Sequence, residues 1–160
     1  MGGKALKALT ILEPWASLIA CGAKKIETRS WRTNYRGKIA IHTGKKFMHG
    51  SIDKFIAIEG WDKYAKMSRP LEQNNMYLEE GVTLGCIVAI ADLVDCVQFT
   101  HSLLPGRNTI LLNGQEVAEN EITFGDCTAG RWGWILENIQ RIEPVPAKGQ
   151  QGLWNWEGGQ

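Results

Sequence analysis

The segment of this 160-residue chain that most constrains its fold is LGCIVAIADLVDCVQF, residues 84–99. Branched apolar residues fill it too densely for the single apolar stripe of a surface helix. Such density is typical of a strand that is buried on both faces. We therefore predict one long buried strand over residues 84–99, with a bend near Asp92 to Asp95.

Shorter elements are expected on both sides of this segment. Because Pro14 suits a first helical position, a short helix is predicted to run from it to Gly22. After Gly22 the spacing changes to the alternation of an extended strand. The predicted elements are strands at 6–12, 26–31 and 38–44, one or two helices within 47–77 that are interrupted at Gly60, and strands at 131–142 and 151–157 after the long strand.

The stretch from about 100 to 130 is more variable in character. It contains LLNGQEV, in which Asn113 and Gly114 form a favoured two-residue hairpin turn, and then a polar run. We predict an inserted hairpin and loop here, within a single domain that spans residues 1–160. Strands outnumber helices and most are joined without a crossover helix, so the predicted class is α+β, mainly β, with a small barrel of mixed strands.

Several classes of protein are disfavoured by the sequence. The four cysteines form no CxxC pair and most lie in apolar stretches, so reduced structural cysteines and no metal site are predicted. Nothing resembles a phosphate-binding loop, a dinucleotide fingerprint or a zinc helix, so no cofactor is predicted. No apolar run approaches the roughly 18 residues of a membrane-spanning helix, and the first residues lack the apolar core of a signal peptide. We therefore expect a cytoplasmic location and no membrane partner.

Charge is distributed unevenly, although the formal net charge is only +1. Between Lys24 and Lys46 the chain has eight basic residues and one acid, and the remainder has an excess of acid. This segment predicts a basic patch suited to nucleic acid. The alternative is that alternate strand positions point to opposite faces and form no single surface. The eight residues are Lys24, Lys25, Arg29, Arg32, Arg36, Lys38, Lys45 and Lys46.

The motif GAKKIETRSW crowds several of these charges together. Strand alternation places Glu27, Arg29 and Trp31 on one face and Thr28 on the other, while the flexible stem of Lys24 reaches back to Glu27. The cluster could transfer protons, with Glu27 as a general base or Lys24 as an activated amine. It could instead bind a nucleotide, with Arg29 and Lys24 contacting phosphate. A third interpretation is an internal ion-pair network that pins the helix to the barrel.

Aromatic and basic side chains near this motif add candidate ligand contacts. Tryptophans beside the motif or near the chain end are expected to stack a base. A histidine in the predicted strand at 38–44 and a lysine just past that strand are further candidates. The predicted ligand-binding residues are Trp15, Lys24, Glu27, Arg29, Trp31, His42, Lys45 and Trp154.

The sequence contains three ordered blocks: LTILEPWASLIACGAKKIETRSWRTNYRGKIAIHTGKK, LGCIVAIADLVDC and RWGWILENIQRIEPVPAKGQQGLWNW. Their most specific feature is the pattern G-x-K-x-x-E-x-R, met by Gly22, Lys24, Glu27 and Arg29. Together the blocks resemble the ASCH domain, a member of the PUA-like superfamily, over nearly the whole chain. The resemblance implies a pseudo-barrel of about five to six mixed strands with short flanking helices.

The same resemblance implies a function. PUA-like domains generally bind RNA, so the implied partner is RNA, another single-stranded nucleic acid or a nucleotide. Some small ASCH proteins are amidohydrolases that deacylate N4-acetylcytidine with a lysine and a threonine spaced three apart; Lys24 matches the lysine, but Glu27 occupies the threonine position. The alternatives are therefore a nucleoside-processing hydrolase or a ribonuclease with Lys24 and Glu27 as catalytic residues, and a protein-interaction module that uses the insert.

Overall fold

The computed structural model describes residues 5–80, 83–106 and 109–158. Its elements are β1 (Leu6–Glu13), α1 (Trp15–Ala20), β2 (Ile26–Arg29), β3 (Gly37–Phe47), η1 (Met48–Gly50), α2 (Ile52–Glu59), α3 (Trp61–Glu72), β4 (Cys86–His101), β5 (Ile110–Leu112), β6 (Gln115–Glu116), α4 (Glu119–Phe124), β7 (Trp132–Pro146) and β8 (Leu153–Trp156).

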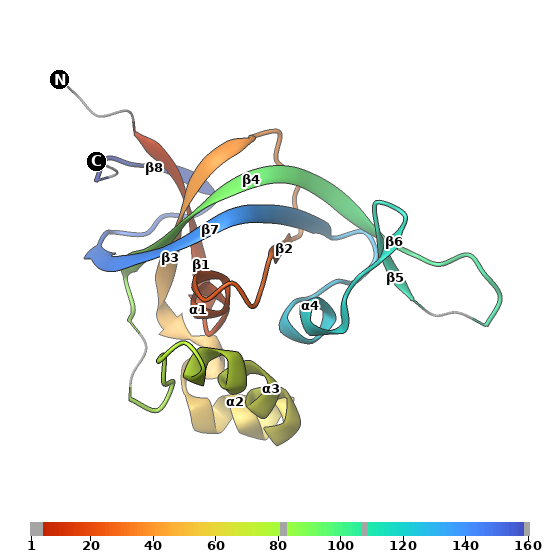
Figure 1. Ribbon diagram of the computed structural model, residues 1–160, viewed down its shortest axis with the longest axis horizontal. Helices are drawn as coiled ribbons and strands as arrows, with labels where there is room; N and C mark the ends of the chain where they lie inside the picture. Colours follow the sequence, from red (N-terminus) through yellow and green to blue (C-terminus); the bar gives the residue numbers. More distant parts are fainter. Residues whose placement is uncertain (1–4, 81–82, 107–108, 159–160) are drawn as a thin grey trace.

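Eight strands in these ranges form one sheet. Six of them follow the order β2-β7-β4-β3-β1-β8 and curl into an open pseudo-barrel (Figure 1), while β5 pairs with β4 and with β6. β1 and β3 are parallel, and their neighbours pair antiparallel. This confirms the predicted α+β, mainly β class.

The long pair β4 and β7 forms the curved centre of the sheet (Figure 1). The register between them shifts at three places, the last of them between Leu93 and Asp95. An extra residue on one strand bends it and increases its twist. The bend predicted near Asp92 to Asp95 therefore coincides with an irregularity of the ladder.

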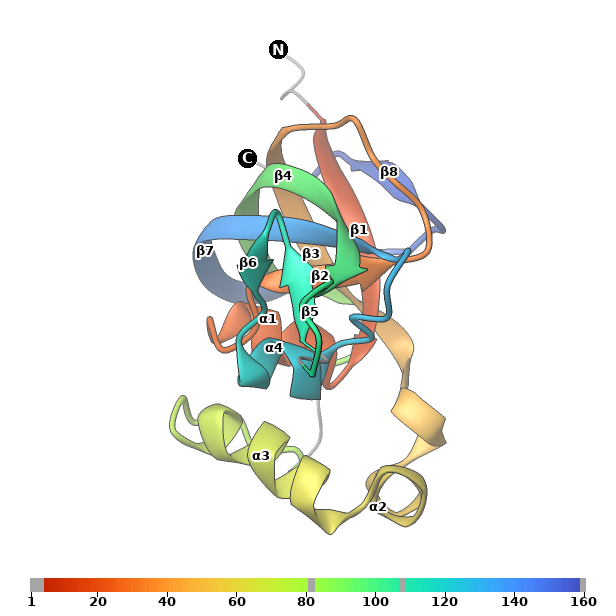
Figure 2. The same ribbon diagram turned by 90° about the vertical axis from the view of Figure 1, so that its right-hand side faces the viewer.

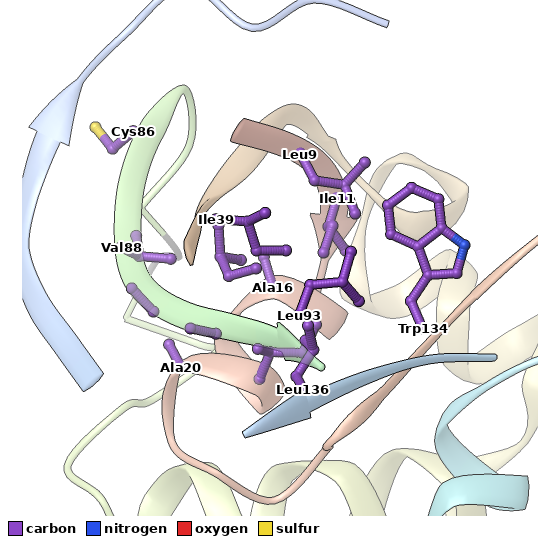
Figure 3. Packing of buried hydrophobic residues seen from close by; sticks show 14 of the residues in the cluster. Leu9, Ile11, Ala16, Ala20, Ile39, Cys86, Val88, Leu93, Trp134 and Leu136 are labelled. Atoms are coloured by element: carbon purple, nitrogen blue, oxygen red, sulfur yellow. The ribbon is translucent and has the colours of Figure 1, made fainter. Parts of the chain in front are cut away.

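The main core fills the inside of this curved sheet, and α1 closes one end of it (Figure 3). Trp134 of β7 has no exposed surface and is the largest side chain in the core. Leu9 and Ile39 from the parallel pair and Ala16 from α1 pack in the same cluster. The apolar residues at alternate positions of these strands therefore point into the main core, as the two-residue period of a strand requires.

The helices α2 and α3 pack beside the barrel around a second apolar cluster (Figure 2). Phe55, Met67 and Leu71 from these helices meet Leu18 of α1 in that cluster. Gly60 separates the two helices with a φ of 94°, in the left-handed region that glycine adopts without a steric penalty. The helices predicted within 47–77 and their interruption at that glycine are confirmed. None of the helices in the described ranges is both long enough and apolar enough to cross a membrane.

The stretch from 100 to 130 contains the predicted hairpin and one helix that the sequence did not predict. Asn113 and Gly114 both have positive φ and join β5 to β6, as a two-residue hairpin turn requires. The polar run after them forms α4 instead of a loop. This short helix buries Glu121 and Phe124 and lies between the barrel and α3 (Figure 2).

Candidate functional site

A cleft of about 360 Å³ lies on the open side of the barrel, where β2 faces the end of β1. Its walls come from the end of β1 with the start of α1, from β2 with its flanking residues, and from the segment between α4 and β7. Five of the eight predicted ligand-binding residues line it. They are Trp15, Lys24, Glu27, Arg29 and Trp31.

Arg29 bridges the two sides of the cleft. Its Nη2 donates a hydrogen bond of 2.8 Å to the carbonyl oxygen of Thr10 in β1, and its Nε lies 3.0 Å from Oε1 of Glu27. The strands β1 and β2 are not paired in the sheet, so this side chain joins two strands that the backbone hydrogen bonds leave apart. About a quarter of the Arg29 side chain, 23%, remains exposed to solvent.

Lys24 is buried beneath this ion pair, with only 1% of its side chain exposed. Its ammonium group donates a hydrogen bond to the carbonyl oxygen of Ile26 and lies 3.9 Å from Oε2 of Glu27. Gly125 covers it from the other side, because a Cβ at that glycine would lie 3.3 Å from Nζ. These contacts form an internal ion-pair network, as the third interpretation of the motif expected, but they link β2 to β1 and do not pin α1 to the barrel.

The segment between α4 and β7 covers part of β2 and changes which residues the cleft contains. Thr28, predicted to point away from the motif, also lines the cleft, because the chain near Gly125 folds over that face of the strand. Arg131 and Asp126 add a second guanidinium group and a carboxylate, with 3.2 Å between Nε and Oδ2. A hydrogen bond from Thr128 is the main cause that lowers the pKa of Asp126, with Arg131 adding to it.

Glu121 of α4 positions the cleft wall, and sequence reasoning missed it. Its Oε1 accepts a hydrogen bond of 2.6 Å from the backbone N–H of Lys25, and its Oε2 accepts one of 3.3 Å from Ile26. Asn120 adds a hydrogen bond from its Nδ2 to the carbonyl oxygen of Ala23. Side chains therefore satisfy the outer edge of β2, where another strand could otherwise pair.

The two tryptophans of the cleft differ in exposure. Trp31 is 37% exposed, and its ring meets the buried ring of Trp134 edge to face at 4.7 Å. Trp15 is half-buried, and its indole nitrogen is buried without a hydrogen-bond partner among the described residues. The ring of Trp31 is thus anchored against the core, and about a third of its surface is available to a ligand.

Three predicted ligand-binding residues lie outside the cleft. His42 is 1% exposed, with Nε2 2.9 Å from the carbonyl oxygen of Ala147, and Trp154 donates from Nε1 to Oγ1 of Thr10 at 3.1 Å. Their rings pack edge to face at 5.5 Å, so Trp154 is a core residue and offers no face for stacking a base. Lys45 is exposed on β3 but does not line the cleft.

The basic segment from Lys24 to Lys46 does not form one surface. Arg36 pairs with Asp95 at 3.0 Å and Lys38 with Asp92 at 3.1 Å, both on β4. Arg32 lies over the ring of Trp132, 5.6 Å from its centre. This corrects the predicted continuous patch, because strand alternation and neighbouring carboxylates divide the charges among different surroundings.

In a comparison against known families, the ASCH domain matches residues 9–145. This chain belongs to the ASCH domain family. Two similar relatives are the activating signal cointegrator 1 proteins of Mus musculus and Homo sapiens, each 31% identical over 90 residues. Those residues are 56% of this ASCH chain but only 14% of each relative. The similarity therefore concerns a small part of the cointegrators.

Proposed function

We propose that this ASCH domain binds single-stranded RNA and that one nucleotide of the strand occupies the cleft beside β2. The observation that carries the proposal is the presence of an exposed indole, Trp31, with the guanidinium groups of Arg29 and Arg131 in a single cleft. Aromatic rings stack unpaired bases, and guanidinium groups bind phosphate through paired hydrogen bonds. The association of the ASCH family with RNA binding supports the same ligand class.

The residues of the motif have different roles in this proposal. Arg29 has exposed surface and contacts the ligand, whereas Lys24 and Glu27 are buried and position its guanidinium group. Asp126 is well exposed and accepts hydrogen bonds from the exocyclic amine of a base, as carboxylates do with cytosine. The hydrolase alternative is less well supported, because a catalytic Lys24 needs surface that a substrate can reach.

Replacing Arg29 with glutamine should weaken binding of a short, mixed-sequence single-stranded RNA by roughly tenfold or more. A hydrogen bond to a charged group contributes about 1.5 kcal/mol or more, which corresponds to that factor. Titration of fluorescently labelled RNA with the protein measures the change. Arg36→Gln is the matched control, since it removes the same charge from the same segment but outside the cleft.

The control should bind nearly as well as the wild-type protein. Trp31→Ala is a second variant in the cleft, with an expected loss of about 1–3 kcal/mol if a base stacks there. Thermal unfolding of each variant distinguishes weaker binding by a folded protein from unfolding of the variant itself. Equal losses in Arg29→Gln and Arg36→Gln, or no binding by the wild-type protein, would overturn the proposal.

A further inference from the structure

A second groove of about 550 Å³ lies between α3 and α4. The two helices lie next to each other in Figure 2. One face of α3 lines it, because Asp62, Ala65, Lys66 and Arg69 recur at the three- and four-residue spacing that places side chains on the same side of a helix. The facing wall is α4. The groove therefore lies between two helices that belong to different parts of the chain, the helical segment after β3 and the insert before β7.

This groove adjoins the cleft. Phe124, at the end of α4, lines both, and its ring is anchored in the second apolar cluster. The charge of Lys63 near the start of α3 contributes to lowering the pKa of Asp126 in the cleft. A chain that leaves the cleft over Phe124 thus enters the groove beside α3.

We propose that Lys66 and Arg69 bind phosphate groups of the nucleotides next to the one in the cleft, so that the domain recognises an RNA strand in preference to a free nucleotide. This inference rests on the proposed function. The two basic residues lie about 4.5 Å apart along the helix axis, and their long side chains can reach neighbouring phosphates of an extended strand.

The surroundings of Lys66 and Arg69 leave both side chains free to bind phosphate. Arg69 has no ion-pair partner among the residues that the structure describes. Lys66 lies 3.6 Å from Glu119, but both side chains are more than half exposed. Exposed pairs of this kind contribute little stability, so a phosphate can replace Glu119 as the partner of Lys66. Glu119 and Asp62 are the acidic groups of the groove, and Glu119 competes with the strand for Lys66.

The double variant Lys66→Gln/Arg69→Gln should bind a short single-stranded RNA about tenfold more weakly than the wild-type protein. The slope of log affinity against log salt should become shallower by roughly 0.7 for each phosphate that the variant no longer binds. The affinity for a nucleoside monophosphate, followed by NMR chemical shifts, should not change because that ligand occupies the cleft alone. Glu119→Gln should act in the opposite direction and strengthen binding of the RNA only.

Lys45→Gln/Lys46→Gln is the matched control, because it removes two exposed positive charges outside both the groove and the cleft. The inference is overturned if the groove variant loses no more RNA affinity than this control while Arg29→Gln still weakens both ligands. That result would mean that the strand leaves the cleft by another route. Failure of the proposed function looks different, since the wild-type protein would then bind neither the monophosphate nor the RNA.

Discussion

Replacing Lys24 with methionine should lower the free energy of unfolding by about 2–4 kcal/mol. The variant keeps an apolar stem of similar length but leaves the carbonyl oxygen of Ile26 without its donor and removes one of the two cations beside Glu27. An unsatisfied buried acceptor costs about 1–3 kcal/mol, and breaking a buried ion pair costs more. Because Arg29 still neutralises the carboxylate, the expected loss is below the largest values known for such pairs.

Urea unfolding of the wild-type protein and the variant measures this difference. Lys25→Met is the matched control, since the neighbouring side chain is exposed and its change should alter stability by less than about 0.5 kcal/mol. A Lys24→Met variant as stable as the wild-type protein would show that the buried charges are held at a cost, as in a strained ligand site. The ion-pair network of Lys24, Glu27 and Arg29 would then not stabilise the fold, contrary to what its geometry indicates.

Glu13→Gln should stabilise the protein at neutral and alkaline pH and have little effect in acid. The carboxyl group of Glu13 has no exposed surface, and burial raises its pKa to about 7 from an ordinary value of 4.5, even though Ser17 donates two hydrogen bonds to it. Between these two values the folded chain keeps a proton that the unfolded chain has lost. The free energy of unfolding therefore falls as pH rises through this range, by about 3 kcal/mol in total.

The variant cannot ionise at this position, and its amide can still bond both polar groups of Ser17. Its stability should match that of the wild-type protein near pH 4 and exceed it by up to about 3 kcal/mol near pH 8. Unfolding by urea at the two pH values gives the difference in the free energy of unfolding between the variant and the wild-type protein. The contributions of carboxylates that both proteins share, such as Glu59 and Asp92, cancel in this difference. Glu137→Gln, at an exposed position, should show no such dependence. A difference that does not vary with pH would contradict the burial of an ionisable Glu13.

Elements defined by local patterns could be predicted from the sequence. The density of apolar residues identified β4, and Asn113 with Gly114 identified the turn between β5 and β6. Gly60 marked the break between two helices. Each of these signals depends on a few neighbouring residues, so it can be recognised without knowing which distant segments come into contact.

The candidate site was predicted only in part, because its remaining features depend on contacts between distant segments. The partners of Glu121 precede it by 96 and 95 residues, so nothing in the polar run around it distinguished α4 from a loop. His42 is enclosed by Gly149, where a Cβ would lie 2.5 Å from its ring. A buried Lys24 also runs against the general exposure of lysine side chains.

The indole N–H signals of the tryptophans in a ¹H–¹⁵N NMR spectrum, recorded while single-stranded RNA is added, test the proposed binding cleft most directly. Single Trp→Phe variants assign the signals. Binding in the cleft should shift the signals of Trp15 and Trp31, which line it, and leave that of Trp156 unchanged, because Trp156 is buried in β8 beside Leu6, at the other end of β1. Shifts confined to Trp156 or to the exposed Trp61 of α3, or no shifts at saturating RNA, would contradict it.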